Sequence, residues 1–427
     1  MIEQSGRFLE MPAELTLNES QRLYGRAQRL IPGVSQTNSK RPPAFAPADY
    51  PAYAAYGKGS HVWDVDGNEY IDWILGLGPI SLGYRYPTVD CAIRKQLERG
   101  IIYGLLDPLE VSVAAKLVDL VPCAESVRFL KGGGEATTAA ARVARAFTGR
   151  DLILSNGYHG WQDQWTATRS DGGVPPAVGT TIREFPYADI DALGEIFRSA
   201  GDNVAAVLMS PALIETPPPG YLGAVRDLCH ANGALLIFDE VVTGFRFSVG
   251  GAQEYFGVTP DLACFAKAMA NGMPLSCFCG RADVMAVTEN LKITATYGGE
   301  ALSLAAADAC LDEYRNNDVI AHIWRIGRRL IEGTNAAAED VGHPVRRTGF
   351  PPLSHLEFRG ETDQESTLMR SYFIRGAAAR GVLFHPGGLS YVCYSHTDAD
   401  VDVTLAVQRE LFVEIEARRR AGTLAEV

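Results

Sequence analysis

The sequence of 427 residues lacks the features that would place it in a membrane, on a secretory route or on nucleic acid. It has no run of 18 apolar residues, so no membrane-spanning helix is predicted. Residues 1–20 are polar and acidic and lack the apolar core of a secretory signal. The formal net charge of −12 argues against nucleic acid or an anionic membrane as a partner, because both require a basic face.

The eight cysteines contain no Cys-x-x-Cys pair, and only Cys277 and Cys279 lie close together along the chain. A scattered set of this kind favours buried free thiols in a reducing compartment over disulfides or metal ligands. We therefore expect a cytoplasmic protein without a metal site.

Helical and strand-like segments alternate from about residue 106 to residue 290. Short apolar runs at 127–130, 152–154, 204–209, 235–238 and 262–265 are the predicted strands. Alternation of this kind is typical of an α/β fold in which helices cover both faces of a mostly parallel sheet. After about residue 305, long helices and short strands predict a second, smaller α+β domain.

The chain length suggests about two or three domains. We expect residues 1–75 to form an N-terminal segment of helix, loop and hairpin that packs with the small domain. Residues 76–305 are expected to form a large domain that carries the chemistry, and residues 306–427 the small C-terminal domain.

Two ionisable residues, Asp239 and Lys267, follow strand-like runs. Open α/β sheets place their chemistry at the carboxyl ends of strands. An amine and an acid at that edge suit pyridoxal 5′-phosphate (PLP), because the amine forms a Schiff base and the acid keeps the pyridine nitrogen protonated. Taken alone, the pair also fits an ordinary α/β protein with a solvated lysine.

Two glycine turns are candidate phosphate sites. The first, Gly132–Gly134, lies between a predicted strand and an alanine-rich helix, where free N–H groups and the helix dipole favour an anion. The second, Thr296–Gly299, also opens a helix. A plain tight turn is the alternative at both. The stretch Tyr158–Trp161 follows another strand and offers aromatic rings that either stack on a flat ligand or pack the loop.

Motifs in this order make the chain resemble class III PLP-dependent aminotransferases of fold type I, in the branch that contains glutamate-1-semialdehyde aminomutase. The matching stretches are residues 62–72, 133–136, 142–151, 158–160, 238–246, 251–253, 260–262, 296–299 and 396–400, together with the segment around Lys267. The resemblance implies PLP as the cofactor, a mostly parallel seven-stranded type of sheet in the large domain, and a homodimer with shared active sites.

The resemblance also implies roles around the cofactor ring. Lys267 would carry the Schiff base and move the proton, and Asp239 would pair with the pyridine nitrogen. Val241 would pack behind the ring, with Tyr158 stacked on its other face and His159 beside it.

On the phosphate side, Gly133 and Gly134 would hold the phosphate, and Thr296 would reach the phosphate of the neighbouring subunit. The family usually has Ser-Gly-Thr where this chain has three glycines at 132–134. Two hydroxyl donors are therefore missing, and a hydrogen bond to a charged group contributes about 1.5–3 kcal/mol.

The aminomutase signatures on the substrate side are absent. Residues 165–175 lack Ala-Gly-Ser-Gly, and residues 386–391, shortly before the His396-Thr397 pair, lack an acid. The loop at residues 39–42 and the stretch 158–161 resemble instead aminotransferases that act on sugar-type carbonyls. The predicted substrate contacts are Trp161, Arg169 and Tyr391.

The sequence thus predicts a PLP-dependent aminotransferase that takes its amino group from an amino acid, expected to be glutamate. The expected acceptor is an oxidised sugar or aminocyclitol of secondary metabolism, as in antibiotic biosynthesis. One alternative is a PLP-dependent isomerase, either an aminomutase or an epimerase. A second is a binding protein that keeps the fold without turnover.

Overall fold

The computed structural model describes residues 15–43, 49–169 and 172–424, which divide into two compact units. The large unit comprises Gly78–Leu82 and Tyr86–Ile323, and the small unit comprises Gly83–Arg85 and the described residues before Gly78 and after Ile323. The sequence-based domain boundaries near residues 75 and 305 stay predictions.

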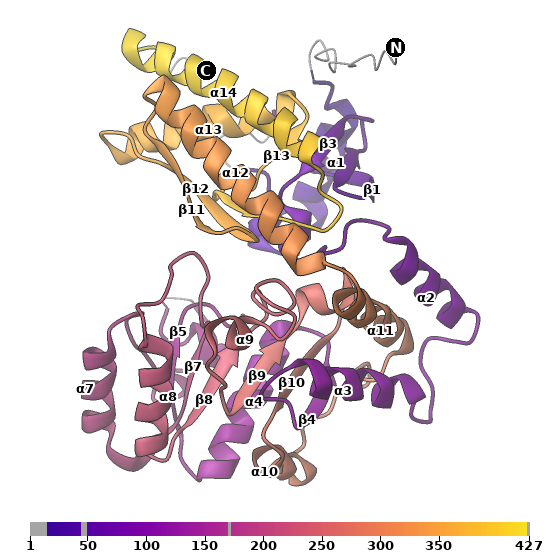
Figure 1. Ribbon diagram of the computed structural model, residues 1–427, viewed down its shortest axis with the longest axis vertical. Coiled ribbons are helices and arrows are strands. Elements are labelled where there is room, and N and C mark those ends of the chain that lie inside the picture. Colours follow the sequence, from indigo (N-terminus) through magenta and orange to yellow (C-terminus); the bar gives the residue numbers. More distant parts are fainter. Residues whose placement is uncertain (1–14, 44–48, 170–171, 425–427) are drawn as a thin grey trace. The chain divides into compact units, whose positions relative to one another are not determined.

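The large unit contains a seven-stranded sheet with the order β4-β10-β9-β8-β7-β5-β6 (Figure 1). Its strands are β4 (Ser126–Leu130), β5 (Leu152–Asn156), β6 (Ile182–Glu184), β7 (Val204–Met209), β8 (Leu235–Asp239), β9 (Leu262–Phe265) and β10 (Ser276–Gly280). All neighbours pair in parallel except β10, which runs antiparallel to both β4 and β9. The predicted α/β class with a mostly parallel sheet is therefore confirmed.

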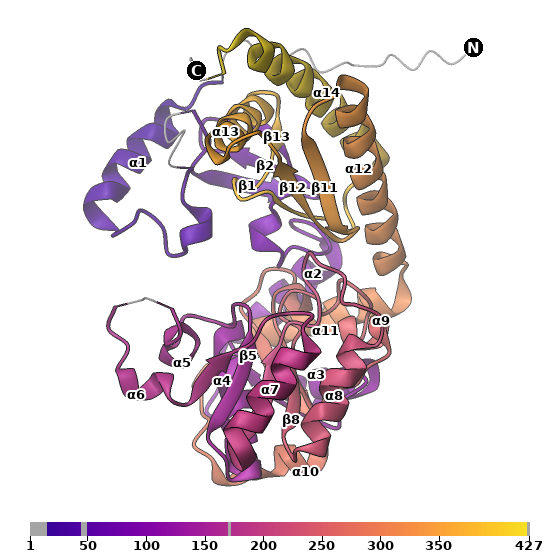
Figure 2. The same ribbon diagram turned by 90° about the vertical axis from the view of Figure 1, so that its left-hand side faces the viewer.

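Strands β7 to β10 are buried at every residue, so helices and loops must cover both faces of the sheet. The alanine-rich α4 (Gly133–Thr148) packs across β7 to β10. Helix α8 (Tyr221–Ala231) packs against β8, and α7 (Ile190–Ala200) lies beside α8 (Figure 2). Small side chains on α4 allow this close approach: Ala136, Ala140 and Ala144 are completely buried.

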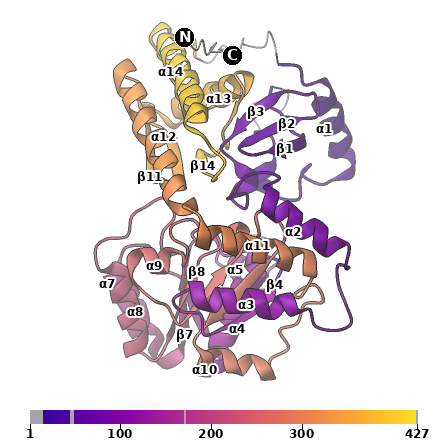
Figure 3. The ribbon, with the colours of Figure 1, turned by 45° about the vertical axis from the view of Figure 1, so that its right-hand side comes forward.

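Two further helices of the large unit, α2 (Pro87–Leu97) and α3 (Pro108–Leu120), each pack on a third, α11 (Ala301–Asn316) (Figure 3). Shorter helices complete it, namely α5 (Asp163–Thr166), α6 (Pro176–Gly179), α9 (Ala252–Phe256) and α10 (Ala282–Met285). Helix α3 begins with Pro108 and a capping box in which Asp107 accepts from the N–H of Leu109 and Glu110 accepts from the N–H of Asp107.

The small unit contains two sheets. The first has the order β1-β2-β3-β13 and is built from Ala54–Lys58, His61–Asp64, Glu69–Asp72 and Val382–Leu383. The second has the order β11-β12-β14 and is built from Val345–Phe350, Leu353–Phe358 and Leu389–Tyr391. Its helices are α1 (Asn18–Leu30), α13 (Asp363–Ala379), α14 (Asp398–Ala421) and the part of α12 (Val319–Val341) that follows Ile323.

The predicted hairpin of the N-terminal segment is present as β2 and β3, and Gly67 in its turn has φ 92°. Within the described ranges, no helix has the length and apolar character needed to cross a bilayer. The same ranges contain no cluster of three or more His, Cys, Asp or Glu side chains suited to a metal ion.

Candidate active site

The amine of Lys267 and the carboxylate of Asp239 are delivered by neighbouring parallel strands. Asp239 is the last residue of β8 and pairs with Cys264 of β9, and Lys267 follows β9 at the start of a short 3₁₀ turn (Lys267–Ala270). Lys267 has φ 43°, in the left-handed region that a residue with a side chain rarely adopts and that costs about 1–3 kcal/mol. The buried residues Ala268 to Ala270 hold this conformation.

The pKa of Lys267 is lowered from 10.5 to about 8. Burial is the main cause, because a buried ammonium loses its hydration. The negative charge of Asp239 opposes the shift, and the positive charge of Arg246 adds to it. The result is an amine that is partly neutral near physiological pH and can act as a nucleophile.

Asp239 is held in place by two hydrogen bonds. Its side chain is 6% exposed, its Oδ1 accepts the N–H of Val241 at 3.0 Å, and its Oδ2 lies 2.7 Å from Nδ1 of His159. The other ring nitrogen of His159 lies 2.8 Å from the carbonyl oxygen of Asn156. His159 is therefore fixed at both nitrogens and orients the carboxylate.

The first glycine turn presents free backbone donors. Glu135 accepts the N–H groups of Lys131 and Gly132 at 3.0 and 2.8 Å. The N–H groups of Gly133 and Gly134, at the start of α4, have no acceptor in the described part of the chain. Two donors at the positive end of a helix dipole suit a phosphate.

The turn is also packed closely against neighbouring side chains. A Cβ atom on Gly133 would lie 2.9 Å from both methyl groups of Val241. A Cβ atom on Gly134 would lie 2.5 Å from Oε1 of Gln162. The backbone of this turn therefore lies in direct contact with the walls of the site.

These residues surround one cavity of about 540 Å³. It is lined by eight residues that the sequence predicted, namely Gly133, Gly134, Tyr158, His159, Trp161, Asp239, Val241 and Lys267. Gln162, Ser210, Leu213 and Val242 line it as well and were not predicted. Ser210 directly follows β7, so the rule that chemistry gathers at carboxyl ends of strands would have found it.

Three predicted residues lie outside the cavity lining. Arg169 stacks over the ring of Tyr158 with 5.7 Å between its Cζ and the ring centroid, and donates to the carbonyl of Gly157 at 3.2 Å. Thr296 is exposed in the turn before α11. Tyr391 belongs to the small unit, where it is buried in β14 and pairs with Leu353.

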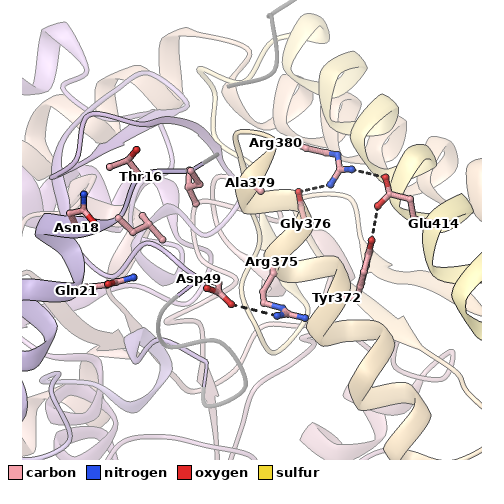
Figure 4. A pocket seen from close by; sticks show the side chains of 12 residues that line it. Thr16, Asn18, Gln21, Asp49, Tyr372, Arg375, Gly376, Ala379, Arg380 and Glu414 are labelled. Carbon is pink, nitrogen blue, oxygen red and sulfur yellow. Dashed lines mark hydrogen bonds and ion pairs between the residues drawn. The ribbon is translucent and has the colours of Figure 1, made fainter. Parts of the chain in front are cut away.

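A cavity of about 620 Å³ in the small unit offers different chemistry (Figure 4). Its arginines are matched by acids: Arg375 lies 3.5 Å from Asp49, and Arg380 lies 2.6 Å from Glu414. None of the described residues that line this cavity is a lysine. It therefore lacks the amine that Schiff-base chemistry needs.

The cavity that contains Lys267 and Asp239 fits PLP on the evidence of the structure alone. The cofactor is a flat ring that carries an aldehyde, a basic ring nitrogen and a phosphate. Lys267 provides the amine, Asp239 the buried acid, and the turn at Gly133 and Gly134 the anion site.

Comparison with known proteins agrees with this fit. A model of the class-III aminotransferase family matches residues 45–402. The chain belongs to this family. The aminotransferase is 36% identical over 414 residues to 3-aminobutyryl-CoA aminotransferase of Cloacimonas acidaminovorans, covering 95% of this chain and 99% of that protein. It is 35% identical to glutamate-1-semialdehyde 2,1-aminomutase of Syntrophobacter fumaroxidans, covering 94% and 99%.

Solved structures give the same assignment. The FumI protein of Sphingopyxis sp. MTA144, in its PLP internal aldimine form, is 27% identical, has a TM-score of 0.88, and is matched over 94% of this chain and 98% of that one. A β-phenylalanine aminotransferase from Variovorax paradoxus is 26% identical with a TM-score of 0.84, over 94% and 95%. The aminotransferase is thus a fold type I, PLP-dependent transaminase, and the predicted fold and cofactor are confirmed.

The lowered pKa of Lys267 predicts how the apoprotein reacts with PLP. Attack on the aldehyde requires the neutral amine, so the rate of covalent binding should rise with pH around a midpoint near 8. In Asp239→Asn, the charge that favours the ammonium is lost, and the midpoint should move to lower pH. Stopped-flow absorbance at saturating PLP measures both midpoints.

Asp227→Asn, which removes an exposed carboxylate from α8, serves as the matched control and should leave the midpoint unchanged. A wild-type midpoint near the ordinary lysine value of 10.5 would show that the amine is hydrated rather than buried.

Proposed function

We propose that this aminotransferase moves an amino group from an amino-acid donor, expected to be glutamate, to the carbonyl group of an oxidised sugar or aminocyclitol. The observation that carries the amino-transfer part of the proposal is the partly neutral amine of Lys267 in one cavity with the buried carboxylate of Asp239. When bound, PLP supplies an electron sink for the carbon that carries the transferred amine.

The proposed roles of the cavity residues follow from their positions. Lys267 moves a proton at its Nζ atom, and a pKa of about 8 lets it act as both base and acid near neutral pH. Asp239 pairs with the pyridine nitrogen, supported by His159. Val241 and Tyr158 enclose the ring, because both line the cavity.

The acceptor class is proposed from the aromatic residues of the cavity. Trp161 is 76% exposed and lines the cavity, so its ring is available to the acceptor, whereas the ring of Tyr158 is assigned to the cofactor and is contacted by Arg169. Aromatic faces bind the apolar side of a sugar ring, while fixed polar groups bind its hydroxyls. Arg169 already contacts Tyr158, which supports a role in positioning that ring.

A second candidate acceptor is a β-keto acyl compound. Two of the similar proteins are named for substrates that carry the amine on the β carbon, 3-aminobutyryl-CoA and β-phenylalanine. The same cavity residues would serve either acceptor, because the cofactor chemistry is the same.

Isomerisation of glutamate-1-semialdehyde is the rival reaction, and relatives at about the same identity carry that name. The missing Ala-Gly-Ser-Gly stretch and the missing acid at residues 386–391 argue against it. We therefore propose a net amino transfer between two substrates.

An acceptor panel tests the reaction type. The enzyme is first converted to its pyridoxamine form with glutamate, and is then given glutamate-1-semialdehyde, keto derivatives of aminosugars and aminocyclitols, or β-keto acyl compounds. We expect the PLP absorbance to return with a sugar-type carbonyl. Return with the semialdehyde alone, accompanied by formation of 5-aminolevulinate, would refute the proposal in favour of an aminomutase.

We also propose a homodimer with shared active sites. Apolar side chains are exposed on the large unit between residues 101 and 118: Ile101, Ile102, Tyr103, Leu105, Leu106, Val111 and Val118. Leu105 and Leu106 are 85% and 87% exposed. A neighbouring groove of about 610 Å³ is lined by Leu106 and Val111 together with Gly298 and Gly299 of the Thr296 turn. Contact with a second copy would bury this surface and bring Thr296 to the other subunit.

Subunit mixing tests the shared site. Lys267→Ala and Thr296→Glu homodimers should each be inactive, because one lacks the amine and the other places a negative charge at the phosphate. In a mixed dimer, one of the two sites has both an intact Lys267 and an intact Thr296, so random mixing should restore about a quarter of wild-type activity. A fully active monomer, or no recovery in verified mixed dimers, would contradict the proposal.

A cytoplasmic location is proposed from the thiols. All eight cysteines are free, and seven of them are buried. Such a set is typical of a reducing compartment.

A further inference from the structure

Within one subunit, the glycine turn at residues 132–134 carries no side-chain hydroxyl, and the hydroxyls of Ser276 and Thr137 beside it do not replace one. The resemblance to the family implies serine at position 132 and threonine at position 134, and this chain has glycine at both. The hydroxyl of Ser276 donates to the carbonyl of Gly132 at 2.9 Å. The hydroxyl of Thr137 donates to the carbonyl of His159 at 2.6 Å. Each has only one hydrogen to give, so both are already used.

The side chain of Gln162 lies over Gly134 instead. A Cβ atom on Gly134 would lie 2.5 Å from Oε1, 2.9 Å from Nε2 and 3.1 Å from Cδ of Gln162. The carboxamide therefore fills the volume that a threonine at position 134 would need. A Cβ atom on Gly160 would lie 2.3 Å from the same Oε1, so the amide lies between two glycines.

One polar atom of the Gln162 amide makes no hydrogen bond. Its Oε1 is buried without a hydrogen-bond partner in the described part of the chain, and Gln162 lines the cavity. A buried amide atom without a partner is costly, by about 1–3 kcal/mol. The Nε2 atom of the same amide is not among the buried atoms without a partner and donates to no group in the described part of the chain, so its NH₂ group is available to a ligand in the cavity.

We propose that the Gln162 side-chain amide donates a hydrogen bond to the cofactor phosphate and replaces the hydroxyl that is missing at Gly134. The free N–H groups of Gly133 and Gly134, and Thr296 of the partner subunit in the proposed dimer, would complete the donor set. This inference rests on the proposed role of that glycine turn as the phosphate site. The amide occupies the space above Gly134, whereas Gly160 requires glycine independently, because its backbone has φ 138°.

Titration of the apoprotein with PLP and with pyridoxal, which lacks the phosphate, isolates the phosphate contact. Visible absorbance and protein fluorescence report binding without turnover. In Gln162→Ala, the dissociation constant for PLP should rise roughly tenfold or more, while that for pyridoxal should stay unchanged. Gln162→Glu keeps the shape but repels the phosphate, so PLP affinity should fall further, again without an effect on pyridoxal.

Three further variants complete the test. Gln164→Ala is the matched control, because Gln164 pairs with Arg145 and does not line the cavity. It should leave PLP affinity unchanged. Gly134→Thr alone should clash with the amide and weaken PLP binding, whereas Gly134→Thr with Gln162→Ala restores a hydroxyl in free space and should recover most of the affinity.

The outcomes separate the two proposals. If wild type binds PLP, and the Gln162 variants bind it equally well or lose PLP and pyridoxal to the same extent, Gln162 only packs the loop and the inference is overturned. If wild type does not bind PLP covalently at all, the proposed function fails, and the inference fails with it.

Discussion

The chemistry of this protein depends on the burial of one amine beside one carboxylate. The strands that deliver Asp239 and Lys267 belong to a sheet whose central residues are buried on both faces. Burial removes water from the Lys267 amine and brings its pKa to about 8, while the carboxylate limits that shift. The left-handed backbone at Lys267 shows that the surroundings enforce its position.

The walls of the cavity are arranged around this pair by close packing. Gly133 lies against Val241, and Gly134 and Gly160 lie against the amide of Gln162, so a side chain on any of the three glycines would require its neighbour to move. The phosphate turn and the ring-binding wall are therefore coupled by direct contact. In our account, the loss of hydroxyls at positions 132 and 134 and the presence of Gln162 are two parts of one arrangement.

Much of this could be predicted from the sequence, because the decisive signals are local. Asp239 and Lys267 each follow a short apolar run, and the glycine turn lies between a strand and a helix. The alternation of strand-like and helical segments predicted the mostly parallel sheet. Gln162 could not be predicted, because its place over Gly134 depends on how two loops meet in space. The surroundings of Arg169 and Tyr391 also depend on tertiary packing. The proposed role of Thr296 depends on the association of two subunits.

The central claim is that Lys267, and not another strand-end lysine, bonds to the cofactor. Lys131 is the rival, since it lines the same cavity, but its Nζ pairs with Glu300 at 2.9 Å. Borohydride reduction of the PLP-loaded protein, followed by peptide mapping, locates the bond directly. We predict pyridoxyl-modified Lys267 in wild type and in Lys131→Ala, and no modification in Lys267→Ala; modification of Lys131 in wild type, or an unchanged yield in Lys267→Ala, would contradict the account.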